Sequence, residues 1–552
     1  MPRGGATDRA ASLLLRASRR SALSWRAGRQ RTQLFAAMRG AVATVLAIVA
    51  CASAKDVVIS GGKAVASVGP RFVSVTLDAS GFDRAWSHVR PFNDTRLINI
   101  AKGLSPAFLR VGGTEADYLY YDLPGSSPSA ARDGDGPRPT HSVTKTMWDG
   151  VTGLAKAAGW SMVFGVSGLN RTTDDVWRPD SARSLLEYAK AQGILVGYEL
   201  HNEEDLDDPK DKTNFTITPE TTAEDFAAMT QLMKDVYGQA GPPTVQESSA
   251  SRPMLIGSDV ADGMSFLADF ASNLSARAAP GSDRVLSALT WHHYYGAGPK
   301  MKVADFVEPR VLDSVRKDVK AAQATAASLP GGTEPWIGES GSSYGGGTPG
   351  VSDRFVSIFW YADQMAYAAL HGHTAVCRQA FIGGAYTLVD PQPVLFPNSD
   401  YWLAALFKRL VGGGQLAVRG QEDEGNELRA YAACARRSGT ADGDAVPGSR
   451  AYPPGSVTAV LINVAAEGVS ASLKLDDGPV PAGASWERFT LTAPQGNLSS
   501  KAIELNGNIL SVAEDGSLPP LDGAAVAPGM QALPAHSVTF LVATTAGAQA
   551  CA

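Results

Sequence analysis

Two glutamates follow short apolar segments of the kind that form buried strands. Glu203 closes the stretch 197–203 (GYELHNE), and Glu339 closes the stretch 335–339 (PWIGE). If both segments are strands of one parallel barrel, their carboxyl ends open onto the same pocket, and the two side chains meet there. Two carboxyl groups across a pocket suit the hydrolysis of a glycosidic bond, because one can protonate the leaving oxygen while the other attacks the anomeric carbon. Asn202, directly before Glu203, makes this interpretation more specific than either glutamate alone.

The elements that would position these glutamates alternate in the way that parallel barrels do. Eight strand-like segments lie between residues 72 and 381, with helical patterns such as 181–192 and 223–237 between them. Eight such units close into an α/β fold, the (β/α)8 TIM barrel, whose active site lies at the carboxyl ends of the strands. The predicted strands are 72–77, 108–111, 162–166, 196–200, 254–258, 289–295, 336–338 and 375–381.

Beyond about Leu410 the pattern changes to period-two strands separated by Gly, Pro and Asp turns, which predicts an antiparallel β-sandwich. The early segment 56–60 is expected to pair into the same sheets. We therefore expect a cleaved leader at 1–54, a strand of the sandwich at 55–70, the catalytic barrel at 71–405 and the C-terminal β-sandwich at 406–552. The predicted sandwich strands are 427–434, 456–464, 470–475, 485–492 and 537–543.

Charge is distributed unevenly along the chain. Residues 1–54 hold nine arginines and a single acid, Asp8, so the net charge of −6 leaves −14 on the other 498 residues. A body this acidic is a poor general binder of nucleic acid or anionic membranes. An apolar run at 41–51, followed by Ala-Ser-Ala, has the order of a secretory signal peptide and is too short to span a bilayer. We expect secretion, or delivery to a compartment like a lysosome or vacuole.

The signal peptide would begin at Met38, so residues 1–37 are either an extension upstream of the true start or a leader resembling a transit peptide. Three cysteines remain after the leader is removed. Cys377 lies in an apolar stretch that favours a buried thiol, so Cys434 and Cys551 are the expected disulfide pair. In a secreted chain the Asn-x-Ser/Thr triplets are acceptors for N-glycosylation, and they occur at Asn93, Asn170, Asn214, Asn273 and Asn497.

Six motifs spread along the chain carry a family resemblance. They are 104–118 (LSPAFLRVGGTEADY), 290–295 (TWHHYY), 338–349 (GESGSSYGGGTP), 386–390 (YTLVD), 400–412 (DYWLAALFKRLVG) and 518–521 (LPPL). With these motifs the chain resembles glycoside hydrolase family 79, the family of the heparanases, from about residue 56 to residue 551. The resemblance implies a retaining mechanism, cleavage of β-linked glucuronic acid, and no metal or organic cofactor.

The resemblance also implies roles for individual residues. Glu203 matches the general acid/base and Glu339 the nucleophile, with carboxyl groups about 5–5.5 Å apart in a retaining enzyme. An ionised Glu339 would favour the protonated form of Glu203. Backbone amides and phenols, rather than an arginine, would bind the uronate carboxylate. We expect His293 in the core, because neighbours on a strand point to opposite faces. The matching substrate-binding positions are Asp78, Thr114, Asn202, His292, Tyr294, Tyr344, Gly345, Gly346, Gly384 and Tyr386.

The chain departs from the family pattern at the third and fourth strands. Where the family has Gly-Asn-Glu-Pro, this chain has His201-Asn202-Glu203-Glu204, and Glu204 is expected to add a negative charge beside Glu203. Where the family has Phe-Gly-Leu-Asn-Ala, residues 164–168 read FGVSG. The altered fourth-strand motif alters the loop around the predicted acid.

A further departure concerns the substrate. Heparanases carry basic clusters flanking the cleft, but the corresponding stretch 259–284 holds four Asp against two Arg, and Glu115 stands where heparanases have lysine. We therefore expect a less sulfated β-glucuronide, in a polysaccharide, a proteoglycan glycan or a small glucuronide. Heparanase is processed by excision of a long linker. That region, roughly 122–148, is shorter here, so we expect an unprocessed monomer.

Three hypotheses follow from these observations. The first is a retaining β-glucuronidase of endo or exo action. The second is a catalytically silent, heparanase-like glycan-binding protein, supported by the altered motif at 201–204. The third is another retaining glycosidase of the same barrel clan.

Overall fold

A barrel of eight parallel strands forms the first part of the fold. The computed structural model describes residues 55–83, 91–126, 141–172, 174–206, 217–239, 241–278, 284–437, 445–476, 478–481 and 483–552. The strands are hydrogen-bonded in the order β8-β7-β4-β3-β12-β11-β10-β9, and a parallel bridge between Tyr198 and Leu255 closes the ring. The eight predicted barrel strands are therefore confirmed. Their bounds are β3 Val73–Asp78, β4 Ala107–Gly112, β7 Trp160–Val166, β8 Val196–Leu200, β9 Ile256–Val260, β10 Ala288–Tyr294, β11 Glu334–Gly341 and β12 Ala375–Arg378.

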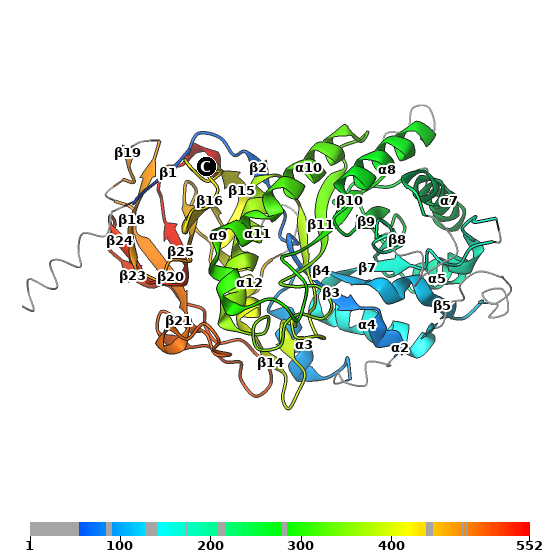
Figure 1. Ribbon diagram of the computed structural model, residues 1–552, viewed down its shortest axis with the longest axis horizontal. Coiled ribbons are helices and arrows are strands. Elements are labelled where there is room, and N and C mark those ends of the chain that lie inside the picture. The colour runs from blue at the N-terminus through cyan, green and yellow to red at the C-terminus, as the bar shows by residue number, and fades with distance from the viewer. Residues whose placement is uncertain are drawn as a thin grey trace, which may run out of the picture. The chain divides into compact units, whose positions relative to one another are not determined.

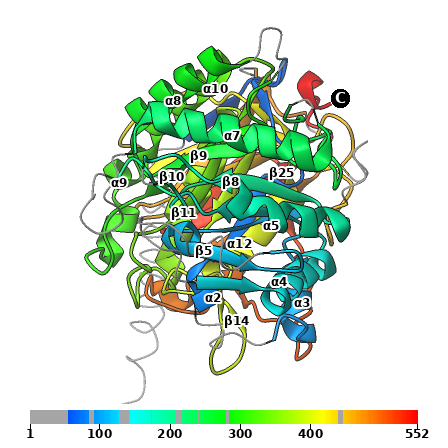
Figure 2. The same ribbon diagram turned by 90° about the vertical axis from the view of Figure 1, so that its right-hand side faces the viewer.

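Helices cover the outside of this barrel, as the two views of the ribbon show (Figure 1, Figure 2). Local sequence signals define their ends. Helix α4 begins after Thr144, whose side chain accepts a hydrogen bond from the Met147 N–H, and it ends at Gly159 in the left-handed conformation. The helices are α2 Ser80–Asp83, α3 Thr95–Lys102, α4 Lys145–Ala158, α5 Asp180–Ala191, α7 Pro219–Tyr237, α8 Met264–Arg277, α9 Pro309–Asp313, α10 Val315–Ser328, α11 Ile358–Leu370 and α12 Ser399–Leu410.

Two sheets form the β-sandwich at the C-terminal end, and they share a buried apolar cluster that includes Val57, Leu461, Leu473 and Leu541. One sheet contains β1, β18, β19 and β24, and the other runs β2-β15-β16-β17-β25-β20-β21-β22, with β23 beside β20. All five predicted sandwich strands are confirmed. The bounds are β1 Lys55–Ile59, β2 Ala66–Ser67, β15 Val411–Leu416, β16 Leu428–Ala435, β17 Val457–Asn463, β18 Val469–Leu475, β19 Gly478–Pro479, β20 Trp486–Thr492, β21 Glu504–Leu505, β22 Asn508–Ile509, β23 Ala524–Val526, β24 Gln531–Leu533 and β25 Ser537–Ala543.

Strand β1 precedes the barrel in sequence but lies in the sandwich, where it pairs with β18. This is the pairing expected for 56–60. The two strands run parallel, with Val57 opposite Leu473, so the sheet differs here from the antiparallel arrangement that the sequence predicts. Two short pairs, β5 (Leu119–Asp122) with β6 (His141–Thr144) and β13 (Val389–Asp390) with β14 (Phe396–Pro397), lie outside both assemblies.

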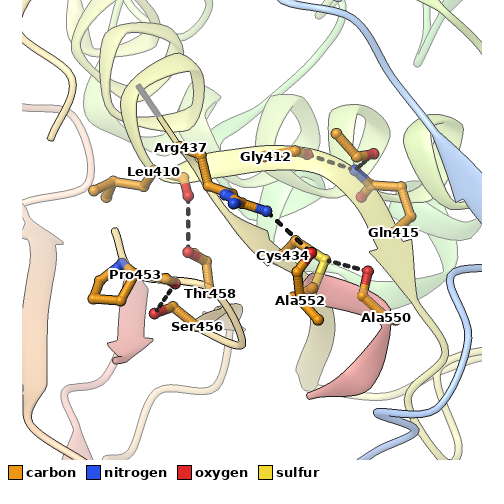
Figure 3. Close-up of a disulfide and its surroundings, with 12 residues drawn as sticks. Leu410, Gly412, Gln415, Cys434, Arg437, Pro453, Ser456, Thr458, Ala550 and Ala552 are labelled. Carbon is orange, nitrogen blue, oxygen red and sulfur yellow. Dashed lines mark hydrogen bonds between the residues drawn. A yellow bond between two sulfur atoms is a disulfide. The ribbon is translucent and has the colours of Figure 1, made fainter. Parts of the chain in front are cut away.

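Barrel and sandwich meet without a linker between them. Helix α12 ends at Leu410 and β15 starts at Val411, so the helix extends past residue 405, where we placed the boundary. The Thr458 hydroxyl on β17 donates to the Leu410 carbonyl across this junction, at 2.8 Å (Figure 3).

A disulfide joins the last residues to the sandwich. Cys434 on β16 is bonded to Cys551 (Figure 3), and Arg437 donates to the backbone carbonyl of Ala552 at 3.1 Å. The disulfide pair expected from the sequence is therefore present. Cys377 is a buried free thiol, also as expected.

The structure bears on only some of the predictions about the leader and the glycosylation sites. The predicted leader and Asn214 lie outside the described residues. Asn93 and Asn497 are exposed and Asn273 is half-buried, whereas the Asn170 side chain is buried and leaves no room for a glycan in the folded chain. Among the described helices, none is long and apolar enough to cross a membrane.

Candidate active site

The two glutamates singled out from the sequence lie opposite each other at the carboxyl ends of the barrel strands. Glu203 follows β8, and Glu339 lies near the end of β11. One carboxylate oxygen of each lies within 4.8 Å of the other, and an imidazole nitrogen of His292 lies within the same distance of both. Glu339 is buried, whereas the Glu203 side chain retains 16% of its exposure. The strand-end argument therefore predicted this juxtaposition correctly.

Arg110 on β4 connects the groups around Glu339. Its guanidinium is fully buried and donates to Glu339 at 2.7 Å, to Glu199 at 2.7 Å, to Asp259 at 3.0 Å and to the Asn202 side-chain oxygen at 3.0 Å. A buried guanidinium is stable only when its donors are paired. Arg110 thus fixes the Glu339 carboxylate and places positive charge beside it.

His292, at the end of β10, lies between the two catalytic candidates and Asp259. Its Nδ1 is 2.9 Å from Glu203, and its Nε2 is 3.4 Å from Asp259. Burial alone would lower the pKa of His292, but the interactions with Asp259 and Glu203 outweigh it and raise the pKa to about 10. The imidazole is therefore a cation at neutral pH and can donate to Glu203.

Asp259 and Glu199 hold opposite protonation states behind the site. Burial would raise the pKa of Asp259, but the Arg110 guanidinium and the His292 imidazole hold it well below its usual value. Burial raises the pKa of Glu199 well above its usual value, so that Glu199 keeps its proton. Asp259 is thus the anion that balances the charge of Arg110 and His292.

Tyr294 adds a second donor to Glu339. Its hydroxyl lies 2.5 Å from Glu339 Oε1, and burial keeps the pKa of this phenol well above 10, so it remains protonated. Burial raises the pKa of Glu339 above its ordinary value, although the charges of His292 and Arg110 and the Tyr294 hydroxyl oppose the rise. The two hydrogen-bond donors on this carboxylate, Arg110 and Tyr294, favour its ionised form against burial.

Glu203, His292 and Glu339 together offer ligand atoms close enough to hold a metal ion. Their surroundings are less suited to one, because the Arg110 guanidinium and the His292 imidazolium already supply positive charge at the same oxygens. The arrangement instead suits proton transfer by Glu203 and nucleophilic attack by Glu339.

A polar wall extends from the glutamates along the ends of β3, β10 and β12. The Gln379 side-chain amide donates to Asp78 at 2.9 Å and to the Tyr386 hydroxyl at 3.3 Å. The Tyr294 ring lies 6.4 Å from those of both Tyr386 and Tyr344, centroid to centroid. The predicted substrate positions on these strands therefore belong to one surface.

Glycines complete this wall. Gly345 and Gly346 have φ of 72° and 89°, a left-handed backbone that favours glycine, and their amide N–H groups donate no hydrogen bond within the described part of the chain. Gly384, at φ 69°, has no room for a side chain, because a Cβ would lie 2.8 Å from the Tyr386 ring. Tyr344, 56% exposed, borders the open side.

Two more predicted residues can be placed. Thr114 begins the short 3₁₀ helix Thr114–Tyr118 directly after β4. It follows Gly113, where an added Cβ would lie 3.2 Å from a carboxylate oxygen of Asp78. His293 points away from the site toward Ser314, its burial lowers its pKa to about 4, and it packs on Trp291 and Tyr295. This agrees with its interpretation as a core histidine.

The chain also matches a known protein family. The family model described as the N-terminal domain of glycosyl hydrolase family 79 matches residues 54–366, more than half of the chain. The chain belongs to glycosyl hydrolase family 79. The polar wall and the glutamate pair described above lie in the barrel of this family 79 chain.

Several relatives extend the match over most of this family 79 chain. Heparanase from Mus musculus is 29% identical over 532 residues, covering 88% of this chain and 92% of its own length. Hyaluronoglucuronidase from Hirudo nipponia is 28% identical, with coverages of 90% and 99%. Inactive heparanase-2 from Mus musculus is 25% identical, with coverages of 89% and 89%.

The fold is also found among solved structures. The 4-O-alpha-L-rhamnosyl-beta-D-glucuronidase from Fusarium oxysporum 12S aligns with a TM-score of 0.57 at 16% identity, covering 88% of this chain and 100% of that one. At this identity the likeness concerns the barrel and sandwich alone.

Sequence reasoning missed four residues of this family 79 site: Arg110, Glu199, Asp259 and Gln379. Each is a charged or amide side chain in or directly after a segment that is otherwise apolar (FLRV, YEL, MLIGS and AVCR). That contrast is a signal in the sequence, since an unpaired charge inside a buried strand is costly. Asp259 was counted with the surface acids of 259–284, but it is buried and belongs to the site.

The expectation for Glu204 needs correction. Both of its carboxyl oxygens are buried and have no hydrogen-bond partner among the described residues. Burial raises the pKa of Glu204 well above its usual value. The carboxyl is therefore neutral, and it does not add the negative charge beside Glu203 that the sequence suggested.

Proposed function

We propose that this protein is a secreted, retaining β-glucuronidase that acts on weakly sulfated or unsulfated glucuronides. The observation that carries the proposal is the distance between Glu203 and Glu339, whose nearest oxygens lie within 4.8 Å. Retaining glycosidases hold their two carboxyl groups about 5–5.5 Å apart, whereas inverting ones leave about 6.5–9.5 Å for a water molecule.

The proposed reaction has two steps. The ionised Glu339 attacks the anomeric carbon, and Glu203 gives its proton to the leaving glycosidic oxygen, which forms a glycosyl ester and a free aglycone. Glu203, now a carboxylate, then takes a proton from water as that water attacks the anomeric carbon and releases Glu339. His292 holds Glu203 at 2.9 Å in both steps.

We assign the binding of the substrate carboxylate to the polar wall and its glycines. The free amides of Gly345 and Gly346, the hydroxyl of Tyr386 and the ring of Tyr344 present donors and an apolar face to one sugar. Asn202 supports the same orientation, because Arg110 and the Gly113 N–H both donate to its side-chain oxygen. Its amide nitrogen is then the part left to face a sugar hydroxyl.

The names of two relatives support this substrate class. Heparanase from Mus musculus and hyaluronoglucuronidase from Hirudo nipponia are 29% and 28% identical to this chain. The net charge of −14 on residues 55–552 argues against a densely sulfated polymer, because like charges repel. An unsulfated chain or a small glucuronide meets less repulsion.

The test is hydrolysis of a chromogenic aryl β-glucuronide by the full-length protein, with a glucoside and a xyloside as comparison substrates. Glu339→Gln should lower kcat by at least about 10⁴-fold, because the nucleophile is lost, without changing the circular dichroism spectrum. Glu334→Gln is a matched control, since Glu334 lies at the opposite end of the same strand. Turnover by Glu339→Gln at the wild-type rate would refute the assignment. Preference for glucoside or xyloside would favour another retaining glycosidase of this clan.

A second candidate function is glycan binding without turnover. His201 and Glu204 replace the glycine and proline that the family pattern has on either side of Asn-Glu, and one relative is named inactive heparanase-2. Binding of glucuronate oligosaccharides with no product after long incubation would support this candidate. Hydrolysis is our primary proposal because Arg110 and Tyr294 both donate to Glu339 and His292 lies 2.9 Å from Glu203.

A further inference from the structure

The loop that carries Glu203 is held in a conformation that ordinarily favours glycine. His201 has φ of 70° and Glu203 has φ of 56°, so two left-handed residues stand on either side of Asn202. Left-handed backbone is unfavourable for residues with a Cβ and persists only where the surroundings hold it. The side chain of His201 is therefore of interest, because it occupies the position at which the family pattern has glycine.

His201 is held by a buried ionic group on the outer side of β8. Its Nε2 lies 2.9 Å from Asp225 on α7, and both side chains are buried. Arg171 pairs with the same carboxylate through both terminal nitrogens, at 2.6 and 3.2 Å. Arg171 also donates to the Gly168 carbonyl at 3.3 Å. The His201–Asp225 pair is thus tied to the loop that follows β7.

Gly168 makes room for this imidazole. A Cβ at position 168 would lie 1.8 Å from His201 Nδ1, far inside van der Waals contact. The histidine at 201 therefore requires glycine at 168, because the imidazole on one loop fills the space that a side chain on the other would need.

We propose that His201, held by Asp225 and accommodated by Gly168, is a positioning residue that holds Asn202 and Glu203 in their working conformation. The proposal rests on the proposed function, because it assigns Glu203 as the acid. His201 itself points toward α7, away from the sugar pocket, so its effect passes through the backbone of residues 201–203. The backbone N–H of Glu203, which donates to the Asp259 carbonyl at 2.9 Å, fixes the other side of the loop.

The test compares two substrates that differ in their need for an acid. A dinitrophenyl β-glucuronide has a good leaving group, whereas an alkyl β-glucuronide needs its leaving oxygen protonated. We expect His201→Ala and Asp225→Asn to lower kcat/KM for the alkyl substrate at least about tenfold more than for the dinitrophenyl substrate, since acid catalysis contributes about 10²–10⁴-fold. A protein that is only partly folded loses both activities equally. Asp175→Asn is the matched control, because Asp175 contacts Arg171 but not His201.

A double-substitution cycle tests the steric pairing. Gly168→Ala alone should displace the imidazole and shift the substrate ratio in the same direction as His201→Ala. Adding His201→Ala should shift the ratio no further, because both substitutions remove the same contact between the imidazole and Asp225. An unchanged ratio in His201→Ala, or additive shifts in the double variant, would overturn the proposal.

The cycle also separates this proposal from the proposed function. If the wild-type protein hydrolyses no glucuronide, the proposed function fails, and the melting temperatures of the same four proteins decide the pairing. A double variant no less stable than Gly168→Ala supports the pairing. Additive losses refute it.

Discussion

The Arg110 side chain makes hydrogen bonds with four other side chains of the site. It donates to Glu339, Glu199, Asp259 and Asn202, and so it links Glu339 to Asn202, beside Glu203, and to the buried Asp259. The positive charges of Arg110 and His292 lower the pKa of Asp259 and oppose the rise that burial causes in the pKa of Glu339.

Removing Arg110 should impair both catalysis and stability. Arg110→Met leaves buried carboxylates unpaired, a change that costs about 3–5 kcal/mol, and kcat should fall at least about 100-fold with the loss of charge at the nucleophile. Denaturant unfolding and steady-state kinetics measure the two effects. Arg183→Met is the control, because the Arg183 ion pair is exposed and should contribute no more than about 1 kcal/mol. Equal stabilities for the two variants would contradict the role given to Arg110.

The charge on His292 predicts a pH dependence of stability. Its pKa rises from an ordinary 6.5 to about 10 in the folded protein. The stabilisation from its charged form is therefore complete below about pH 6.5 and is lost as the pH rises toward 10. We expect the difference in unfolding free energy between wild type and His292→Gln to shrink between pH 7 and pH 10. Urea unfolding at unit pH intervals measures it, and a constant difference would show that His292 is neutral.

At the residue scale, the sequence predicts those groups whose position follows from a strand end. Glu203 and Glu339 are predictable because each directly follows an apolar strand pattern. The partners of Arg110 and Asp259 are not predictable, since they come from strands up to 229 positions away and depend on how the barrel closes. His201 was read as a disturbance of the motif, and only its contact with Asp225 on a distant helix shows how it is accommodated.

At the scale of elements, the polar wall depends on short connections between strands and helices. The loop after β11 and the loop after β12 touch through the Ala385 N–H, which donates to the Gly346 carbonyl at 2.6 Å. Gly384 lies at this contact with φ of 69°. The wall is thus shaped by backbone conformation as much as by side chains.

Gly384→Ala should weaken substrate binding. Its Cβ would lie 2.8 Å from the Tyr386 ring and 2.9 Å from the Gly346 carbonyl, so both would shift. We expect KM for an aryl glucuronide to rise about tenfold, as for the loss of one charge-assisted hydrogen bond, with a smaller change in kcat. Gly350→Ala is the matched control, because Gly350 is also left-handed, at φ 78°, and has open space around it. A similar KM in both variants would show that the polar wall does not bind the substrate.

The elements themselves were largely predictable from the sequence. The eight barrel strands and five sandwich strands show period-two or continuous apolar patterns, which reflect burial within a few residues. The parallel direction of β1 was not predictable, because its partner β18 is a distant segment and local pattern carries no direction. The change of pattern at Leu410 coincides with the end of α12, whereas the boundary at 405 lies inside this helix, because helix and strand join there without a turn.

At the scale of the whole described fold, barrel and sandwich share one interior. All thirteen residues of α11 are buried. Asp363 on this helix pairs with Arg429 on β16 at 3.0 Å and accepts from the Tyr431 hydroxyl at 2.6 Å. Phe407 of α12 lies against Phe540 of β25, with ring centroids 6.3 Å apart. The sandwich therefore packs directly against the barrel and shares a buried core with it.

The disulfide should matter for stability and not for chemistry. It joins residues 117 positions apart, and removing a cross-link of this kind costs about 2–5 kcal/mol. We expect Cys434→Ser/Cys551→Ser to lose that much in guanidinium unfolding while kcat at 25 °C stays within about twofold, because the catalytic groups keep their own contacts. Dithiothreitol should destabilise wild type and leave the double variant unaffected. Sensitivity of the double variant to dithiothreitol would show that a cysteine other than these two forms a disulfide, which would contradict the assignment.

The pairing of β1 with β18 has a consequence for synthesis on the ribosome. Asp56 accepts a hydrogen bond from the Ser472 hydroxyl, 416 positions later in the chain. At about 5–20 residues per second, roughly 20–80 s pass between the emergence of the two strands. For most of that interval the barrel is being translated while the apolar residues of β1, a strand of the sandwich, lack both of their neighbours, which are residues 417–419 and β18. Successful maturation thus depends on keeping this early segment out of wrong contacts until residues 417–475 have emerged.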